Sequence, residues 1–159
     1  MSTTNLGFEV NQDTQRTSEE IDNNGFFPAL SLAEFVTLFA IPSTIENDLL
    51  KAKLLVAMDE VNQKLNSFKE QQIKNGFATL ASVPGDQLGG ESAKLMQYKQ
   101  AVYAEAKAEL INTSVSMARR AEAENSAASA AELLSYYKKI STNAVARITG
   151  RGSIGVHLI

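Results

Sequence analysis

Few side chains in this 159-residue sequence could carry out catalysis or hold a metal ion. There is no cysteine, which excludes disulfides and thiolate metal sites, and the single histidine, His157, lies near the C-terminus. A serine–histidine–aspartate site needs an imidazole held rigidly in a pocket, so we interpret His157 as a surface residue. Only an all-oxygen metal site then remains, and we interpret Asp59 and Glu60 as the solvated flank of a helix. The sequence therefore predicts no catalytic, cofactor or metal site.

A glycine-rich stretch could in principle cradle a phosphate group. It contains Gly85, Gly89 and Gly90. A P-loop requires Gly-Lys-Ser/Thr after its glycines and a strand before them. Here Glu91 and Ser92 follow instead, and a carboxylate would repel phosphate. We therefore predict that these glycines form turns.

The charge balance argues against a dedicated nucleic-acid-binding surface. The formal net charge is -3, from 15 basic and 18 acidic residues, whereas nucleic-acid-binding domains usually carry a basic excess. We interpret the basic pairs Arg119-Arg120 and Lys138-Lys139 as solvated helix faces. One class of function that the sequence leaves open is a small soluble helical protein with a regulatory or nucleic-acid-binding function. A basic recognition helix would favour that class, and we find none.

The sequence predicts neither export nor membrane insertion. The longest apolar stretch, residues 35–42, is far too short to cross a bilayer. The first residues lack the basic start and the apolar core of a secretory signal. The absence of cysteine fits a reducing compartment.

Three Ser-x-x-Glu capping boxes mark the expected helix starts. The first, at residues 31–34, opens a short helix, and the second, at residues 43–46, opens the longest helix, which runs to about Lys74. Six apolar residues on that longest helix recur at spacings of three and four and define one buried face: Leu50, Leu54, Met58, Val61, Leu65 and Phe68. The third box, at residues 129–132, opens the last helix, which ends at Gly150.

The middle of the chain is expected to contain a loop and a third helix. Residues 75–92 form the loop, with Phe77 and Leu80 as anchors into the core. The third helix spans about residues 92–117. Residues 118–128 lose apolar periodicity and form either a polar helical extension or a turn.

Four tyrosines lie on the predicted helices. For Tyr98 and Tyr103 we expect ordinary core packing. Two adjacent helical residues cannot both face one core, so we expect either Tyr136 or Tyr137 to lie at an interface, where tyrosine is enriched.

The C-terminal end of the chain suggests contacts with a partner, whereas residues 1–25 are either an arm that orders against a partner or a disordered tail without a role. We predict an all-α fold, a bundle of about four helices over residues 26–150, with an extended polar arm at residues 1–25 and a strand-like tail at residues 151–159. Apolar residues alternate in this tail, as in a strand that adds to the sheet of a partner. The residues expected to contact a partner or a neighbouring subunit are Arg151, Ile154, Val156, His157, Leu158 and Ile159.

Several runs of the sequence together resemble one known family. They appear in the family's order and spacing: Phe26-Phe27-Pro28, residues 58–65, residues 76–84, residues 90–92, residues 98–110, residues 144–148 and Gly150-Arg151. On these residues the chain is similar to the head-completion protein L family of contractile-tailed coliphages and related prophages. Unlike the family tail, this chain has no second basic residue soon after Gly150-Arg151.

The resemblance implies a structural protein of the phage neck rather than an enzyme. Such a protein would bind the portal protein as a homo-oligomeric ring, a dodecamer by analogy. The ring would complete and stabilise the DNA-filled head and extend the DNA channel, with packaged DNA passing through without sequence-specific binding. It would also offer the docking surface for a tail-side neck or tail-terminator protein. The protein would be in the host cytoplasm before assembly and in the virion afterwards, with no cofactor and no membrane partner.

Overall fold

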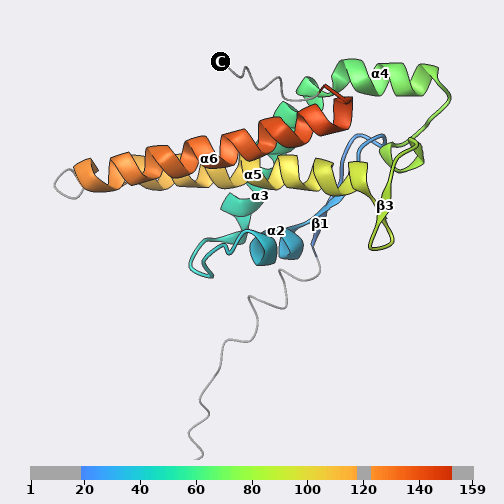
Figure 1. The fold of residues 1–159 in the computed structure, drawn as a ribbon. Coiled ribbons are helices and arrows are strands. Elements are labelled where there is room, and N and C mark those ends of the chain that lie inside the picture. The colour runs from blue at the N-terminus through green and yellow to red at the C-terminus, as the bar shows by residue number, and fades with distance from the viewer. Residues whose placement is uncertain (1–18, 118–122, 152–159) are drawn as a thin grey trace, which may run out of the picture.

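The structure is a computed structural model that describes residues 19–117 and 123–151. Two long antiparallel helices, α5 (Ala93–Met117) and α6 (Ala123–Thr149), lie side by side, and α3 (Asn47–Lys64) crosses α5 (Figure 1). At 1.5 Å per residue, α5 and α6 are each about 40 Å long. The shorter helices are α2 (Leu32–Leu38) and α4 (Asn66–Lys74). The mainly α-helical class predicted from the sequence is confirmed.

Helix α5 is the centre of the core because it contacts α6, α3 and the segment around α2. Every residue from Ala101 to Ala106 is buried. The predicted face of the longest helix is also confirmed, since Leu50, Leu54, Met58, Val61 and Leu65 are buried. The largest buried side chains of the remaining core are aromatic or leucine residues: Leu30, Leu32, Phe35, Leu80, Tyr98 and Tyr103.

The longest predicted helix is divided in two, which corrects the expectation of one helix from the second capping box to Lys74. Helix α3 begins at Asn47 after Glu46, which makes no side-chain capping bond, and the helix is interrupted at Leu65 (φ -98°, ψ 4°). Leu65 itself is fully buried, whereas none of the residues of α4 is. Full burial thus ends at Leu65, Phe68 on α4 is only partly buried against the core, and α4 leaves in another direction (Figure 1).

The third capping box does not start a helix. Helix α6 runs from Ala123 through Ser129 and Glu132 without interruption. Alanine, the strongest helix former, precedes and follows Ser129 and keeps the backbone helical there. A residue can act as an N-cap only where its own backbone is not helical. Of the stretch 118–128, the last six residues are helical, and residues 118–122 lie outside the described residues.

The predicted loop at residues 75–92 contains short ordered elements. A 3-10 turn, η1 (Leu80–Ser82), buries Leu80, and Phe77 packs against the core, so both expected anchors are confirmed. Strands β3 (Gln87–Leu88) and β4 (Glu91–Ser92) then form a hairpin. Its two turn residues, Gly89 and Gly90, have φ of 60° and 83°. Both values lie in the left-handed region that two-residue hairpin turns require, so the turn interpretation of these glycines is correct.

Part of the predicted N-terminal arm packs against the body. Strand β1 (Glu20–Ile21) pairs with β2 (Leu30–Ser31), and Ile21 is buried. Lys51 Nζ lies 2.5 Å from Glu19 Oε1, which ties this segment to α3. Residues 1–18 lie outside the described residues. No helix in the described part of the chain is both long and apolar enough to span a membrane.

Candidate functional site

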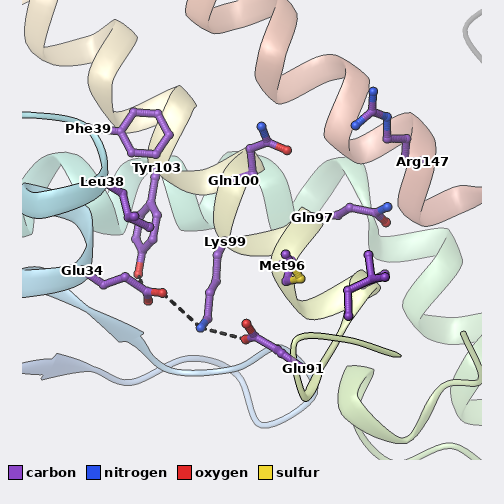
Figure 2. A pocket seen from close by; sticks show the side chains of 12 residues that line it. Glu34, Leu38, Phe39, Glu91, Met96, Gln97, Lys99, Gln100, Tyr103 and Arg147 are labelled. Atoms are coloured by element: carbon purple, nitrogen blue, oxygen red, sulfur yellow. Dashed lines mark hydrogen bonds and ion pairs between the residues drawn. The ribbon is translucent and has the colours of Figure 1, made fainter. Parts of the chain in front are cut away.

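A half-open groove of about 540 Å³ lies between four elements of the fold. The first turns of α5 form its floor, and α2, the β3–β4 hairpin and the end of α6 form its sides. Figure 2 shows the side chains that line it. The groove brings together residues that are more than one hundred positions apart in the sequence, from Glu34 to Arg147.

Ion pairs on the floor of the groove hold α2 and the hairpin against α5. Lys99 Nζ lies 2.8 Å from Glu91 Oε1 and 3.3 Å from Glu34 Oε1 (Figure 2). Tyr103 donates a hydrogen bond of 2.9 Å to Glu34 Oε2. Burial, reinforced by this bond, raises the pKa of Tyr103, so its hydroxyl stays protonated. These groups satisfy one another, which indicates a structural role.

The first capping box explains where Glu34 points. Ser31 Oγ accepts a hydrogen bond from the Glu34 amide, as expected for the N-cap of α2. The carboxylate of Glu34, however, bonds Tyr103 and Lys99. The box was correctly predicted as a helix start, and its glutamate serves to fix α2 to α5.

Three exposed apolar side chains line the groove beside its polar residues. Leu38, Leu88 and Met96 line it with 63%, 56% and 42% of their surface accessible. Large apolar side chains gathered around a concave surface are typical of a protein interaction site. The groove is therefore a candidate binding site for an apolar segment of protein.

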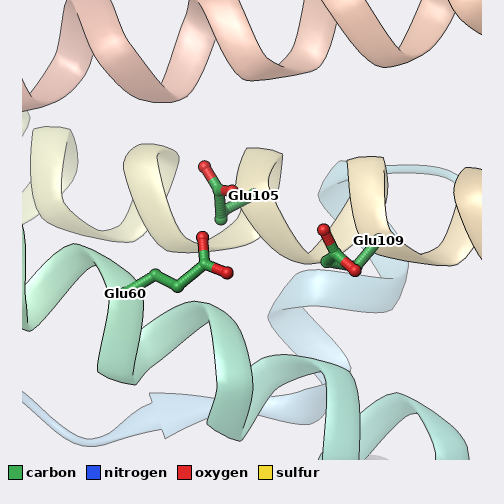
Figure 3. A group of neighbouring side chains, drawn as sticks. All are labelled: Glu60, Glu105 and Glu109. Atoms are coloured by element: carbon green, nitrogen blue, oxygen red, sulfur yellow. The ribbon is translucent and has the colours of Figure 1, made fainter.

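A second cluster of charged side chains lies between α3, α5 and α6, and Glu105 is its buried member. The carboxylates of Glu60, Glu105 and Glu109 lie within 4.8 Å of one another (Figure 3). The Lys138 ammonium group forms ion pairs with Glu105 and, at 3.2 Å, with Glu109, and Lys64 Nζ lies 3.5 Å from Glu105. Only 1% of Glu105 is exposed. Lys138 Nζ also lies 4.0 Å from Glu60 Oε2, so this one lysine pairs with all three carboxylates, which indicates an internal charge network.

The pKa values of this cluster are shifted in opposite directions. Burial alone would raise the pKa of Glu105, but hydrogen bonds from Lys138 and Glu60 and the charge of Lys64 lower it to about 2. Hydrogen bonding with Glu105, and then burial, raise the pKa of Glu60. Glu105 thus carries the buried negative charge, and Lys138 neutralises it.

The cluster corrects two sequence interpretations. Glu60 is half-buried and hydrogen-bonded with Glu105, so it is not part of a solvated helix flank, whereas Asp59 is exposed as expected. Lys138 is an ion-pair partner of buried carboxylates, whereas its neighbour Lys139 is exposed as expected. The signal that could have revealed the cluster is Glu105 itself, since an isolated acid within an otherwise buried helix needs a cationic partner.

Tyr98 is the centre of a polar network that the sequence did not reveal. Its hydroxyl donates to Asn62 Oδ1 and accepts from Asn23 Nδ2, both at 2.7 Å. Asn62 Nδ2 donates to Asn23 Oδ1 at 2.9 Å, which closes a ring of three side chains. The Tyr98 ring is stacked on Phe27 with 4.7 Å between centroids. The network connects the N-terminal segment to α3 and α5.

Replacing Tyr98 with phenylalanine is expected to lower the free energy of unfolding by about 1–3 kcal/mol, because two part-buried amides lose their partner. Urea unfolding followed by circular dichroism measures this change. Tyr136→Phe is the matched control, since 58% of Tyr136 is exposed. Equal stability of the two variants would contradict the network.

The predicted partner-binding residues lie at or beyond the end of the described chain. Arg151 is exposed directly after α6. Ile154, Val156, His157, Leu158 and Ile159 lie outside the described residues, as do Arg119 and Arg120. Of the adjacent tyrosines, Tyr137 contacts the Phe39 ring and Tyr136 points outward, so the prediction that they cannot share one core is confirmed.

The sequence profile of the phage head completion protein (GPL) family matches residues 21–159. The chain belongs to this family. The resemblance inferred from the sequence is thereby confirmed, and the matched region contains every described helix and strand except the first residue of β1.

Two curated members of this kind are similar to the chain. The head completion/stabilization protein of Escherichia phage P2 is 36% identical over 90 residues, which cover 57% of this chain and 53% of that protein. The probable head completion/stabilization protein of Haemophilus phage HP1 (strain HP1c1) is 33% identical over 91 residues, covering 57% and 61%. The chain thus spans between half and two thirds of these relatives. No solved structure matches it.

Proposed function

We propose that this protein is a structural subunit that completes and stabilises the DNA-filled head of a tailed phage. The family match over residues 21–159 is the observation that carries this proposal. The names of the P2 and HP1 relatives support it, since both are described as head completion/stabilization proteins. The alternative of a regulatory or nucleic-acid-binding protein has no comparable support.

In the proposed role the protein binds the portal as a ring, a dodecamer by analogy with the family. The ring extends the DNA channel and offers a docking surface to a tail-side neck or tail-terminator protein. Exposed apolar side chains on two different helices support side-by-side packing of subunits: Leu49, Leu55 and Val56 on α3, and Leu133 and Tyr136 on α6. Two unlike surfaces that meet produce head-to-tail contacts, which close into rings. The net charge of -3 is compatible with a channel through which DNA slides.

The C-terminal tail is the proposed contact with the portal or with a neighbouring subunit. Its candidate residues are Arg151, Ile154, Val156, His157, Leu158 and Ile159. Because its apolar side chains alternate, the tail can place them in pockets of the partner on one side. Its backbone can meanwhile form hydrogen bonds with the edge of a sheet in the partner. The protein would assemble from the host cytoplasm into the neck of the virion.

Deletion of residues 155–159 is expected to leave the helical circular dichroism spectrum unchanged and to abolish attachment to portal-bearing heads. The fold should persist because every described helix and strand ends before Arg151. Co-sedimentation with DNA-filled, tailless heads measures attachment. Ser135→Ala, at an exposed position of α6, is the control that should bind normally. Normal attachment by the truncated protein would rule out the tail as the contact.

A further inference from the structure

The groove described above has the dimensions of a binding site for a short extended peptide. Its floor follows α5 from Ala93 to Tyr103, a length of about 15 Å at 1.5 Å per residue. Leu38, Leu88 and Met96 surround it with exposed apolar surface. An extended segment of five or so residues would cover this length, at about 3.3 Å per residue.

The chain leaves α6 at one end of this groove. Arg147, in the last turn of α6, lines the groove (Figure 2). Lys94 Nζ donates a hydrogen bond of 3.4 Å to the Ile148 carbonyl, which holds the end of α6 beside the start of α5. Residues 152–159 therefore begin within a few residues of the groove, and eight residues can extend about 26 Å. This reach exceeds the length of the groove.

The chemistry of these eight residues matches the surface of the groove. Ile154, Val156 and Leu158 alternate, so in an extended conformation they lie on one side. This apolar side of the tail is complementary to the apolar side chains that line the groove, Leu38, Leu88 and Met96. Strand β3 pairs only with β4 among the described strands, which leaves its outer edge open to a further strand beside Leu88.

We propose that the groove binds the chain's own C-terminal segment, residues 152–159, in the free subunit. The groove then shields the apolar side chains of the tail from solvent until a partner binds the tail. Because the tail and the groove belong to one chain, the groove competes for the tail at an effective concentration in the millimolar range. Only a partner that binds the tail more strongly than the groove does will release it. This inference concerns the unassembled protein and does not depend on the proposed head-binding role.

Disulfide trapping tests the placement of the tail, because the chain has no cysteine of its own. Met96→Cys combined with Val156→Cys joins the groove to the tail. Ile73→Cys with Val156→Cys is the matched control, since Ile73 is also apolar and exposed but lies on α4, outside the groove. Helix α4 is also near the end of α6, because the Phe68 ring of α4 lies 5.8 Å from Lys94 Nζ, which bonds the Ile148 carbonyl. In dilute protein without phage heads, the first pair is expected to form an intramolecular disulfide at least about tenfold faster than the control. Equal rates, or cross-links mainly between two chains, would overturn the proposal.

A synthetic peptide of residues 152–159 provides a second measurement. It is expected to bind the chain that ends at Arg151, and to bind the full-length protein at least about tenfold more weakly, because the tethered tail occupies the groove. Met96→Asp in the shortened chain should remove peptide binding while leaving the helical spectrum unchanged, since Met96 is exposed. Equal binding to both chains, or binding that Met96→Asp does not alter, would overturn the proposal. Neither assay contains heads, so failure here is distinct from failure of head attachment.

Discussion

Replacing Lys138 with methionine is expected to lower the free energy of unfolding by about 3 kcal/mol. Lys138 bonds Glu105, of which only 1% is exposed, and also Glu109. Methionine keeps the length of the side chain but leaves Lys64, at 3.5 Å, as the only cationic partner of Glu105 among the described residues. A buried carboxylate that loses its main cationic partner strongly destabilises the folded protein. Urea unfolding at neutral pH measures it.

Lys139→Met is the matched control, since Lys139 is the next residue on α6 and is exposed. It should change stability by less than about 0.5 kcal/mol. The effect of Lys138→Met should also depend on pH. Because the pKa of folded Glu105 is about 2, below its ordinary 4.5, its ionised form stabilises the protein above about pH 4.5, and this stabilisation is lost as the pH falls toward 2. The free energies of unfolding of the unmodified protein and of Lys138→Met should therefore converge as the pH falls toward 2. A difference between them that does not change with pH would contradict the ion pair between Lys138 and Glu105.

Replacing Phe35 with alanine is expected to lower the free energy of unfolding by about 3–5 kcal/mol. Phe35 is fully buried, and its ring is stacked on Tyr103 with 5.4 Å between centroids and contacts Phe39 at 6.0 Å. This aromatic group joins the seven-residue helix α2 to α5. A cavity at its centre would loosen the wall of the groove together with the core. Thermal and urea unfolding measure the loss.

Leu38→Ala is the control on the same helix, because 63% of Leu38 is exposed. Its effect on stability should stay below about 0.5 kcal/mol. If docking of the tail occurs as proposed, Leu38→Ala should nevertheless weaken binding of the tail peptide to the shortened chain, since Leu38 lines the groove. A large loss of stability in Leu38→Ala would mean that α2 packs differently from the arrangement described.

Hydrophobic periodicity was sufficient to predict the main helices. The spacing from Leu50 to Leu65 identified the buried face of α3, and the run from Ser92 gave the extent of α5 to within one residue. The break at Leu65 could not be predicted, because Phe68 continues the spacing although α4 has no buried residue. Ser129 misled for the opposite reason, since a capping sequence within a run of alanines remains helical.

The candidate site was much harder to predict than the helices. Its residues come from α2, the hairpin, α5 and α6, and only the tertiary fold brings Glu34, Glu91 and Lys99 together. Local pattern contains no information on such long-range pairs. The pair Lys138-Lys139 predicts a solvated helix face, because short basic pairs usually lie on one. The partner of Lys138, Glu105, lies on another helix. Membership of the head completion family, by contrast, was evident from the sequence, because it rests on residue identities along the chain.

The measurement that tests the proposed role most directly is binding of the purified protein to DNA-filled, tailless heads, followed by sedimentation. We predict that the protein remains with heads that carry the cognate portal, at a fixed copy number near a dodecamer, as expected for a closed ring. Heads without portal serve as the control and should retain none. Absence of the folded protein from portal-bearing heads of its own phage would contradict the proposed function.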